Sequence, residues 1–178
     1  MGYFYLIFLN IQHFWVQTYE NEPYQKGINK VIELLQKRLN TIDPSKSIVD
    51  LFDTRESLEN LCLMSGGHVR NLLLLMKEAL KYTSTLPISK KALQRSISEL
   101  RNTYKNTIYA NEWEALAKVY DSKEIVNDKL YRGLLFNRCI LEYRYQQPDG
   151  ETKVWYDIHP LIKGIKEFQD TYNQLYPG

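Results

Sequence analysis

Residues 61–76 read LCLMSGGHVRNLLLLM, an apolar segment that is interrupted once, at Ser65-Gly66-Gly67. Apolar residues recur at helical spacing on both sides, and a glycine pair is a strong signal for the end of a helix. The pattern therefore predicts two helices joined by a tight turn. Arg70 falls within the first turn or so of the second helix, where backbone N–H groups favour an anion.

Helical periodicity predicts a small bundle around this turn. Thr54 and Ser89 are residue types that favour helix N-caps, and Asp43-Pro44-Ser45 marks a loop over residues 40–49. The predicted helices are Tyr24–Leu39, Thr54–Met64, Val69–Tyr82 and Ser89–Tyr109.

After about Asn111 the pattern changes. Short helices are predicted first, then two strands rich in β-forming residues around an Asp-Gly turn, then a closing helix. The segments are Glu112–Tyr120, a polar helix or turn at Asp121–Asp128, Lys129–Asn137, strands Cys139–Tyr145 and Lys153–Ile158, and Leu161 to about Tyr172. Three helices followed by a hairpin is the order of a winged-helix domain. The expected fold is mainly α: a small helical bundle followed by a winged-helix domain with a two-stranded wing.

Composition is that of an ordinary globular protein. The 178 residues include 23 basic and 21 acidic ones, and a net charge of +2 is too small to argue for a nucleic-acid partner. Cys62 and Cys139 lie in apolar patterns, without a CxxC motif or a Cys/His cluster. We therefore expect neither a disulfide framework nor a metal site, and a cytoplasmic location.

Residues 1–16 read MGYFYLIFLNIQHFWV and are apolar and aromatic. No basic residue precedes the apolar run, and Asn10, Gln12 and His13 interrupt it well short of the roughly 20 residues that a membrane helix needs. We interpret this segment as one or two strands, with no role in a membrane. An unpaired strand edge would pair with a second copy, be covered by the chain's own helices or be disordered, so a homodimer through residues 1–16 is one expectation.

The Ser-Gly-Gly-x-x-Arg pattern ending at Arg70 resembles the sensor 2 element in the helical lid of AAA+ ATPases, especially the origin-recognition (Orc-like) branch and STAND-type bacterial relatives. Residues 13–38 resemble the last strand of the ATPase core and the first lid helix, and residues 134–143 and 155–161 resemble a winged-helix end. The resemblance covers roughly residues 12–168. It implies strands of an ATPase core at 1–20, a lid at 21–110 and a winged helix at 111–178.

The resemblance implies that Arg70 senses the γ-phosphate of ATP and that Gly66 and Gly67 form its turn. No GxxxxGK[ST] phosphate loop occurs, and no apolar run ends in paired acids. We therefore expect a non-catalytic portion of a longer ATPase. ATP and Mg²⁺ are implied only for that parent protein, and the missing core or another protein is the expected partner. The alternative is a free-standing winged-helix module that binds nucleic acid or protein. Arg70 would then be a surface residue after an ordinary helix C-cap.

A winged helix can place its third helix, here with Lys129 and Arg132, in a DNA groove. Residues 112–163 nevertheless contain eight basic and nine acidic residues, which favours a protein partner. Residues 81–105 hold six basic residues and one acid. The basic residues that DNA would contact there are Lys90, Lys91, Arg95, Arg101 and Lys105. A solvated helix face explains the same run.

Asp157 and His159 share a strand face and suggest general-base chemistry, but no nucleophile accompanies them. The alternative is a structural turn, with Pro160 in the first turn of the last helix. We therefore assign no catalytic residues.

Overall fold

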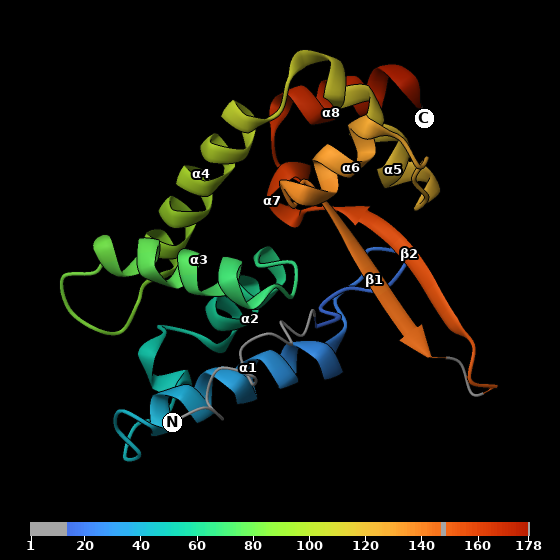
Figure 1. Ribbon diagram of the computed structural model, residues 1–178. Helices are drawn as coiled ribbons and strands as arrows, with labels where there is room; N and C mark the ends of the chain where they lie inside the picture. Colours follow the sequence, from blue (N-terminus) through green and yellow to red (C-terminus); the bar gives the residue numbers. More distant parts are fainter. Residues whose placement is uncertain (1–13, 147–148, 178) are drawn as a thin grey trace, which may run out of the picture. The chain divides into compact units, whose positions relative to one another are not determined.

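The computed structural model describes residues 14–146 and 149–177 (Figure 1). This part of the chain forms eight α-helices and one two-stranded antiparallel sheet, which confirms the mainly helical class. The chain divides into two compact units, an N-terminal unit that ends at Ser96 and a C-terminal unit that begins at Ile97. The division falls inside helix α4 (Lys90–Thr107), so one helix contributes to both units.

Three helices form the body of the N-terminal unit. Helix α1 (Gln25–Asn40) packs on α2 (Arg55–Met64), and α2 packs on α3 (Val69–Lys81). The Thr54 hydroxyl accepts the Ser57 N–H and so caps α2. Burial of each large aliphatic side chain stabilises the fold by about 1.5–3 kcal/mol. The buried ones include Ile28, Val31, Leu35, Leu58, Leu61, Leu72 and Leu75.

Backbone pairing fixes the start of α4. After the 3₁₀ turn η1 (Val49–Leu51), the Ile88 N–H donates to the Leu51 carbonyl at 2.8 Å, and the Asp53 N–H donates to the Ile88 carbonyl at 3.0 Å. The Ser89 hydroxyl then accepts the Ala92 N–H, which is the N-cap role expected for this residue.

The C-terminal unit builds a second core from helices and a hairpin. In chain order it contains the end of α4, η2 (Ala110–Glu112), α5 (Trp113–Ser122), α6 (Lys129–Phe136), β1 (Ile140–Gln146), β2 (Thr152–Ile158), α7 (Pro160–Lys163) and α8 (Lys166–Leu175). Helix α5 contacts α8 and β2, and α6 contacts β1. The strands pair with Ile140 opposite Ile158. Both residues are buried in the core that Leu116, Leu134, Ile162 and Phe168 also enter.

Two elements differ from the sequence prediction. The polar helix or turn predicted at Asp121–Asp128 is an extension of α5 to Ser122, followed by Lys123 in the left-handed region (φ 60°), which ends the helix. The single closing helix is two helices, α7 and α8, because Ile165 adopts an extended conformation.

The predicted strand at residues 1–16 lies outside the described residues, apart from Phe14 to Val16. Among residues 14–146 and 149–177, every helix is too short or too polar to span a bilayer.

Candidate functional site

The turn between α2 and α3 is built from two glycines in the left-handed region. Gly66 has φ 63° and Gly67 has φ 77°, conformations that cost other residues about 1–2 kcal/mol each. The Ser65 hydroxyl donates to the Cys62 carbonyl at 2.6 Å and accepts the Gly67 N–H at 3.1 Å. The predicted helix–glycine–helix junction is therefore present, and Ser65 fixes its geometry.

The segment Phe14–Gln17 crosses this turn. The Phe14 N–H donates to the Gly67 carbonyl at 3.0 Å, and a Cβ atom on Gly67 would lie 1.8 Å from the Phe14 carbonyl oxygen. At the start of α1, a Cβ atom on Gly27 would lie 1.3 Å from the Trp15 carbonyl oxygen. Each glycine thus leaves the space that the passing backbone fills, and the segment is held at two points.

Arg70 is the second residue of α3 and is exposed. His68 precedes the helix without a side-chain hydrogen bond to its first turn, and that turn contains no acidic residue. Among the described residues, no hydrogen bond or ion pair engages the Arg70 guanidinium. The first backbone N–H groups of a helix and a guanidinium can together bind an oxyanion. An arginine that binds no ligand and only contacts solvent would be exposed in the same way.

The basic residues of α4 in the N-terminal unit have local contacts. The Lys90 ammonium lies 3.6 Å from Glu56, and its backbone N–H donates to Asp53. The Arg95 guanidinium lies 4.3 Å from the centre of the Tyr82 ring, which is cation–π geometry. Lys91 is exposed.

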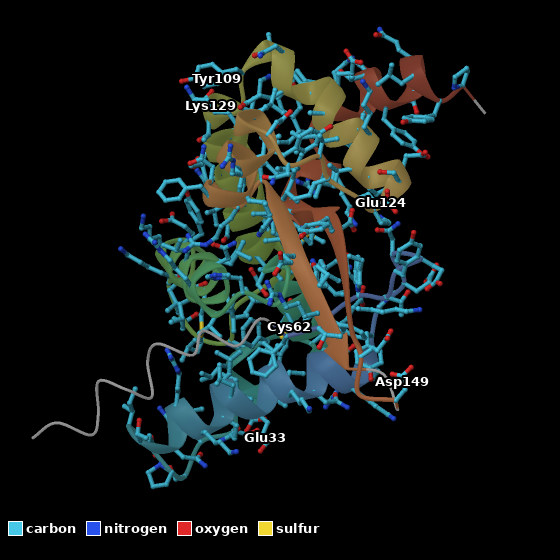
Figure 2. All side chains as sticks on the ribbon, turned by 45° about the vertical axis from the view of Figure 1, so that its right-hand side comes forward. Glu33, Cys62, Tyr109, Glu124, Lys129 and Asp149 are labelled. Atoms are coloured by element: carbon cyan, nitrogen blue, oxygen red, sulfur yellow. The ribbon has the colours of Figure 1, made fainter. Side chains whose placement is uncertain are left out.

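The other four basic candidates lie in the C-terminal unit and form two separate pairs. Arg101 and Lys105 on α4 contact the α7–α8 junction: Arg101 lies against Gly164, and Lys105 forms an ion pair with Glu167. Lys129 and Arg132 are exposed on α6, with Lys129 at its start (Figure 2). The Arg132 Nε atom donates to the Asp128 carbonyl. The described contacts do not join the pairs into one basic surface.

A buried charge cluster in the same unit was missed by the sequence analysis. The Asp157 carboxylate is fully buried and lies 3.0 Å from the Lys123 ammonium and 2.7 Å from the Lys163 ammonium. Both ammonium groups also lie near the face of the Tyr120 ring, at 4.5 and 5.2 Å from its centre. Burial lowers the pKa of Lys163, and Asp157 opposes that shift.

Two of the eight basic residues and one of the nine acidic residues in 112–163 belong to this cluster. The other charged residues of that segment therefore carry a more negative net charge. Nothing in the local sequence marks Lys123 as buried, because its burial depends on the left-handed end of α5. The nearby His159 is also buried. Its Nδ1 atom accepts the Leu161 N–H at 3.2 Å, and its ring stacks on Tyr104 at 4.8 Å. These contacts give Asp157 and His159 structural roles.

Both cysteines are buried free thiols, and burial raises the pKa of each to about 12. At neutral pH they are protonated and poor nucleophiles. Among residues 14–146 and 149–177, no group of three or more His, Cys, Asp or Glu side chains has the geometry of a metal site.

Comparison with known proteins found no matching family model, no matching curated protein and no matching solved structure.

Proposed function

We propose that this chain is the lid and winged-helix portion of an AAA+ or STAND-type ATPase, and that it couples nucleotide state, sensed through Arg70, to a partner protein. The chain has no phosphate loop, so in this proposal it is not itself an enzyme. The nucleotide and its Mg²⁺ are held by a separate ATPase core.

The observation that carries the proposal is the position of Arg70. It follows a turn that only glycines can form without strain, it is exposed, and it lies beside helix N–H groups that have no side-chain cap. An arginine there can donate two hydrogen bonds to a terminal phosphate, and it would contact ATP and ADP differently.

The contacts of the turn before Arg70 could transmit a difference between bound ATP and bound ADP to the rest of the N-terminal unit. The Gly67 carbonyl holds the Phe14 N–H, and Val16, two residues further on, is fully buried and accepts the Tyr24 N–H at 2.8 Å. A displacement of the turn would therefore pull on the segment that enters α1. In the resembling ATPases this segment is the connection between core and lid.

The C-terminal unit supplies the partner surface in this proposal. Its order of α5, α6 and hairpin fits a winged helix. The tip of the hairpin exposes Asp149, which Figure 2 labels. Glu151 is exposed near it in the sequence, and both carboxylates would repel nucleic-acid phosphates. A protein with a basic or apolar surface suits this tip better than DNA does.

The test is a nuclear magnetic resonance titration of the ¹⁵N-labelled full chain with MgATP and MgADP. We expect weak binding that shifts the amides of residues 67–72 and of Phe14, with larger shifts for ATP. Arg70→Ala should abolish these shifts, whereas Lys77→Ala, which removes another exposed base of α3, should retain them. ATP binding tighter than about 10 μM, or shifts at residues 67–72 that survive Arg70→Ala, would contradict the proposal.

One observation favours the alternative of a free-standing binding module. Helix α6 exposes Lys129 and Arg132, and 87% of the Phe136 surface is accessible to solvent. An electrophoretic mobility shift with random duplex DNA at low salt distinguishes the two. Under this alternative, binding is lost in Lys129→Ala/Arg132→Ala and unchanged in Arg70→Ala.

A further inference from the structure

The C-terminal unit contains a small pocket between the end of α4 and the α7–α8 junction. Its volume is about 250 Å³, below the roughly 300–1,000 Å³ of pockets for drug-sized ligands. A small ion or one group of a larger molecule would fill it. The lining includes Arg101, Asn102 and Lys105 from α4 and Gly164, Lys166 and Glu167 from the junction.

Arg101 lines this pocket and forms no ion pair among the described residues. Its guanidinium lies against Gly164, where an added Cβ atom would be 2.3 Å from the Arg101 Cζ atom. Its Nε atom is buried and has no hydrogen-bond partner among the described residues. Burial lowers the pKa of Arg101. By contrast, Lys105 pairs with Glu167 and Lys166 pairs with Asp170.

Glu167, which lines the same pocket, has an unsatisfied hydrogen-bond acceptor. One of its carboxylate oxygens, Oε1, pairs with Lys105, while the other, Oε2, is buried without a hydrogen-bond partner among the described residues. Buried polar atoms are normally satisfied, so each such exception requires an explanation. Here an unsatisfied donor and an unsatisfied acceptor belong to two residues that line one cavity.

A ligand that satisfies both atoms must accept one hydrogen bond and donate another, and it must carry negative charge to balance Arg101, since Lys105 and Lys166 already have carboxylate partners. A phosphate group that retains one proton has these properties: its oxygens accept and its P–OH donates. A sulfate ion and a phosphodiester have no proton to donate at neutral pH, and Glu167 would repel them.

We propose that this pocket binds a protonated phosphate group, either inorganic phosphate or the terminal phosphate of a monoester. The pocket would take the group in the form that still holds the proton lost with a pKa of about 6. Arg101 Nε donates to a phosphate oxygen, and the phosphate hydroxyl donates to Glu167 Oε2. Helix α8 also begins here, and its first-turn dipole favours the same ligand. This site is independent of Arg70, which lies in the other unit.

The experiment titrates the ¹⁵N-labelled full chain with inorganic phosphate, adenosine monophosphate, sulfate and a short DNA duplex. We expect phosphate to shift the amides of residues 164–168 and to bind about tenfold more tightly than sulfate. Stronger binding of phosphate than of the monoester identifies a site for the free ion, and the reverse identifies a site for a phosphorylated molecule.

Three variants test the assigned contacts. Arg101→Lys keeps the charge but removes the Nε donor, and it should weaken phosphate binding about tenfold. Glu167→Gln replaces the acceptor with an amide that can donate, and it should remove the preference for phosphate over sulfate. Gly164→Ala should displace the guanidinium and also weaken binding. Arg95→Ala and Arg70→Ala are controls that should leave these shifts unchanged.

Three results would overturn the proposal. One is the absence of amide shifts at residues 164–168 with millimolar phosphate. Another is equal binding of sulfate and phosphate by the unmodified chain. The third is DNA that shifts the same amides and competes with phosphate, which would assign the pocket to phosphodiesters. Loss of the Arg70-dependent shifts alone would leave the pocket proposal intact, and loss of the pocket shifts alone would leave the Arg70 proposal intact.

Discussion

The turn between α2 and α3 and the junction between α7 and α8 both break a helix at glycine, but for different physical reasons. Gly66 and Gly67 are required by backbone conformation, since both have φ values in the left-handed region. Gly164 has φ −94°, which any residue adopts, and its distinguishing feature is space: the Arg101 guanidinium lies where a Cβ atom would be, so another residue would have to displace that flexible side chain. A left-handed backbone conformation is signalled locally by glycine in the sequence. A space requirement set by a residue far away in the chain has no such local signal.

The two breaks also hold their arginines differently. The first turn is fixed by backbone and Ser65 contacts and leaves Arg70 exposed. The second follows Lys163, which the buried Asp157 anchors, and it keeps Arg101 Nε buried. Arg70 is therefore open to solvent, whereas Arg101 lines a small pocket. Substitutions at each break can test this contrast.

The largest expected loss of unfolding free energy is from Asp157→Asn. This substitution removes the carboxylate that contacts Lys163, just before the α7–α8 junction. The two ammonium groups would then lose the Asp157 carboxylate that both contact, and Lys123 is almost fully buried. Loss of one partner from a buried ion cluster costs about 3–5 kcal/mol. Urea denaturation measures the free energy of unfolding. Asp170→Asn, which removes an exposed partner of Lys166, is the matched control and should cost under about 1 kcal/mol.

Gly67→Ala, in the turn between α2 and α3, is expected to lower the free energy of unfolding by slightly less, about 3 kcal/mol. The left-handed conformation costs alanine about 1–2 kcal/mol, and the overlap with the Phe14 carbonyl adds displacement of a hydrogen-bonded segment. Gly150→Ala is the control, because Gly150 has φ 89° but no atom of the described residues lies within 4 Å of its Cβ position. It should lose only the conformational part, and equal losses in both variants would show that the Phe14 contact contributes nothing.

Gly164→Ala should destabilise the protein by less than about 1 kcal/mol, because the obstructing atoms belong to the end of a flexible arginine side chain. Thermal denaturation of this variant beside Gly67→Ala measures the contrast directly. A loss as large as that of Gly67→Ala would mean that the second break, too, depends on the backbone of its glycine.

The smallest effect is expected for Arg70→Ala, whose free energy of unfolding should stay within about 0.5 kcal/mol of the unmodified chain. Arg70 is exposed and has no hydrogen bond or ion pair among the described residues. Urea denaturation checks this value. A loss above 1 kcal/mol would show that Arg70 stabilises the fold and would weaken the case for a contact made only with a ligand.

Much of the fold could be predicted because periodicity and punctuation lie in the local sequence. The helices around Gly66-Gly67, the caps at Thr54 and Ser89 and the hairpin around Gly150 all have signals within a few residues. The α7–α8 break could not be predicted, since a lone glycine between apolar residues is compatible with a continuous helix.

The candidate site residues likewise differ in whether a local sequence pattern points to them. Arg70 is a candidate that the sequence alone can suggest, because the glycine turn before it is a local pattern. Lys123 and Asp157 were counted as ordinary charges, and their pairing joins residues more than thirty positions apart. Arg101 stands out in the sequence only as part of a basic run, and no local pattern indicates that it shares a pocket with Gly164 and Glu167.

The glycine contacts of the Phe14–Gln17 segment have a consequence for mutational tolerance. Gly67 and Gly27 lie against the carbonyl groups of Phe14 and Trp15, which every amino acid possesses. A saturation scan should therefore find the two glycines nearly irreplaceable, while Phe14 accepts many side chains. Proline is the exception, because it has no N–H to donate to Gly67.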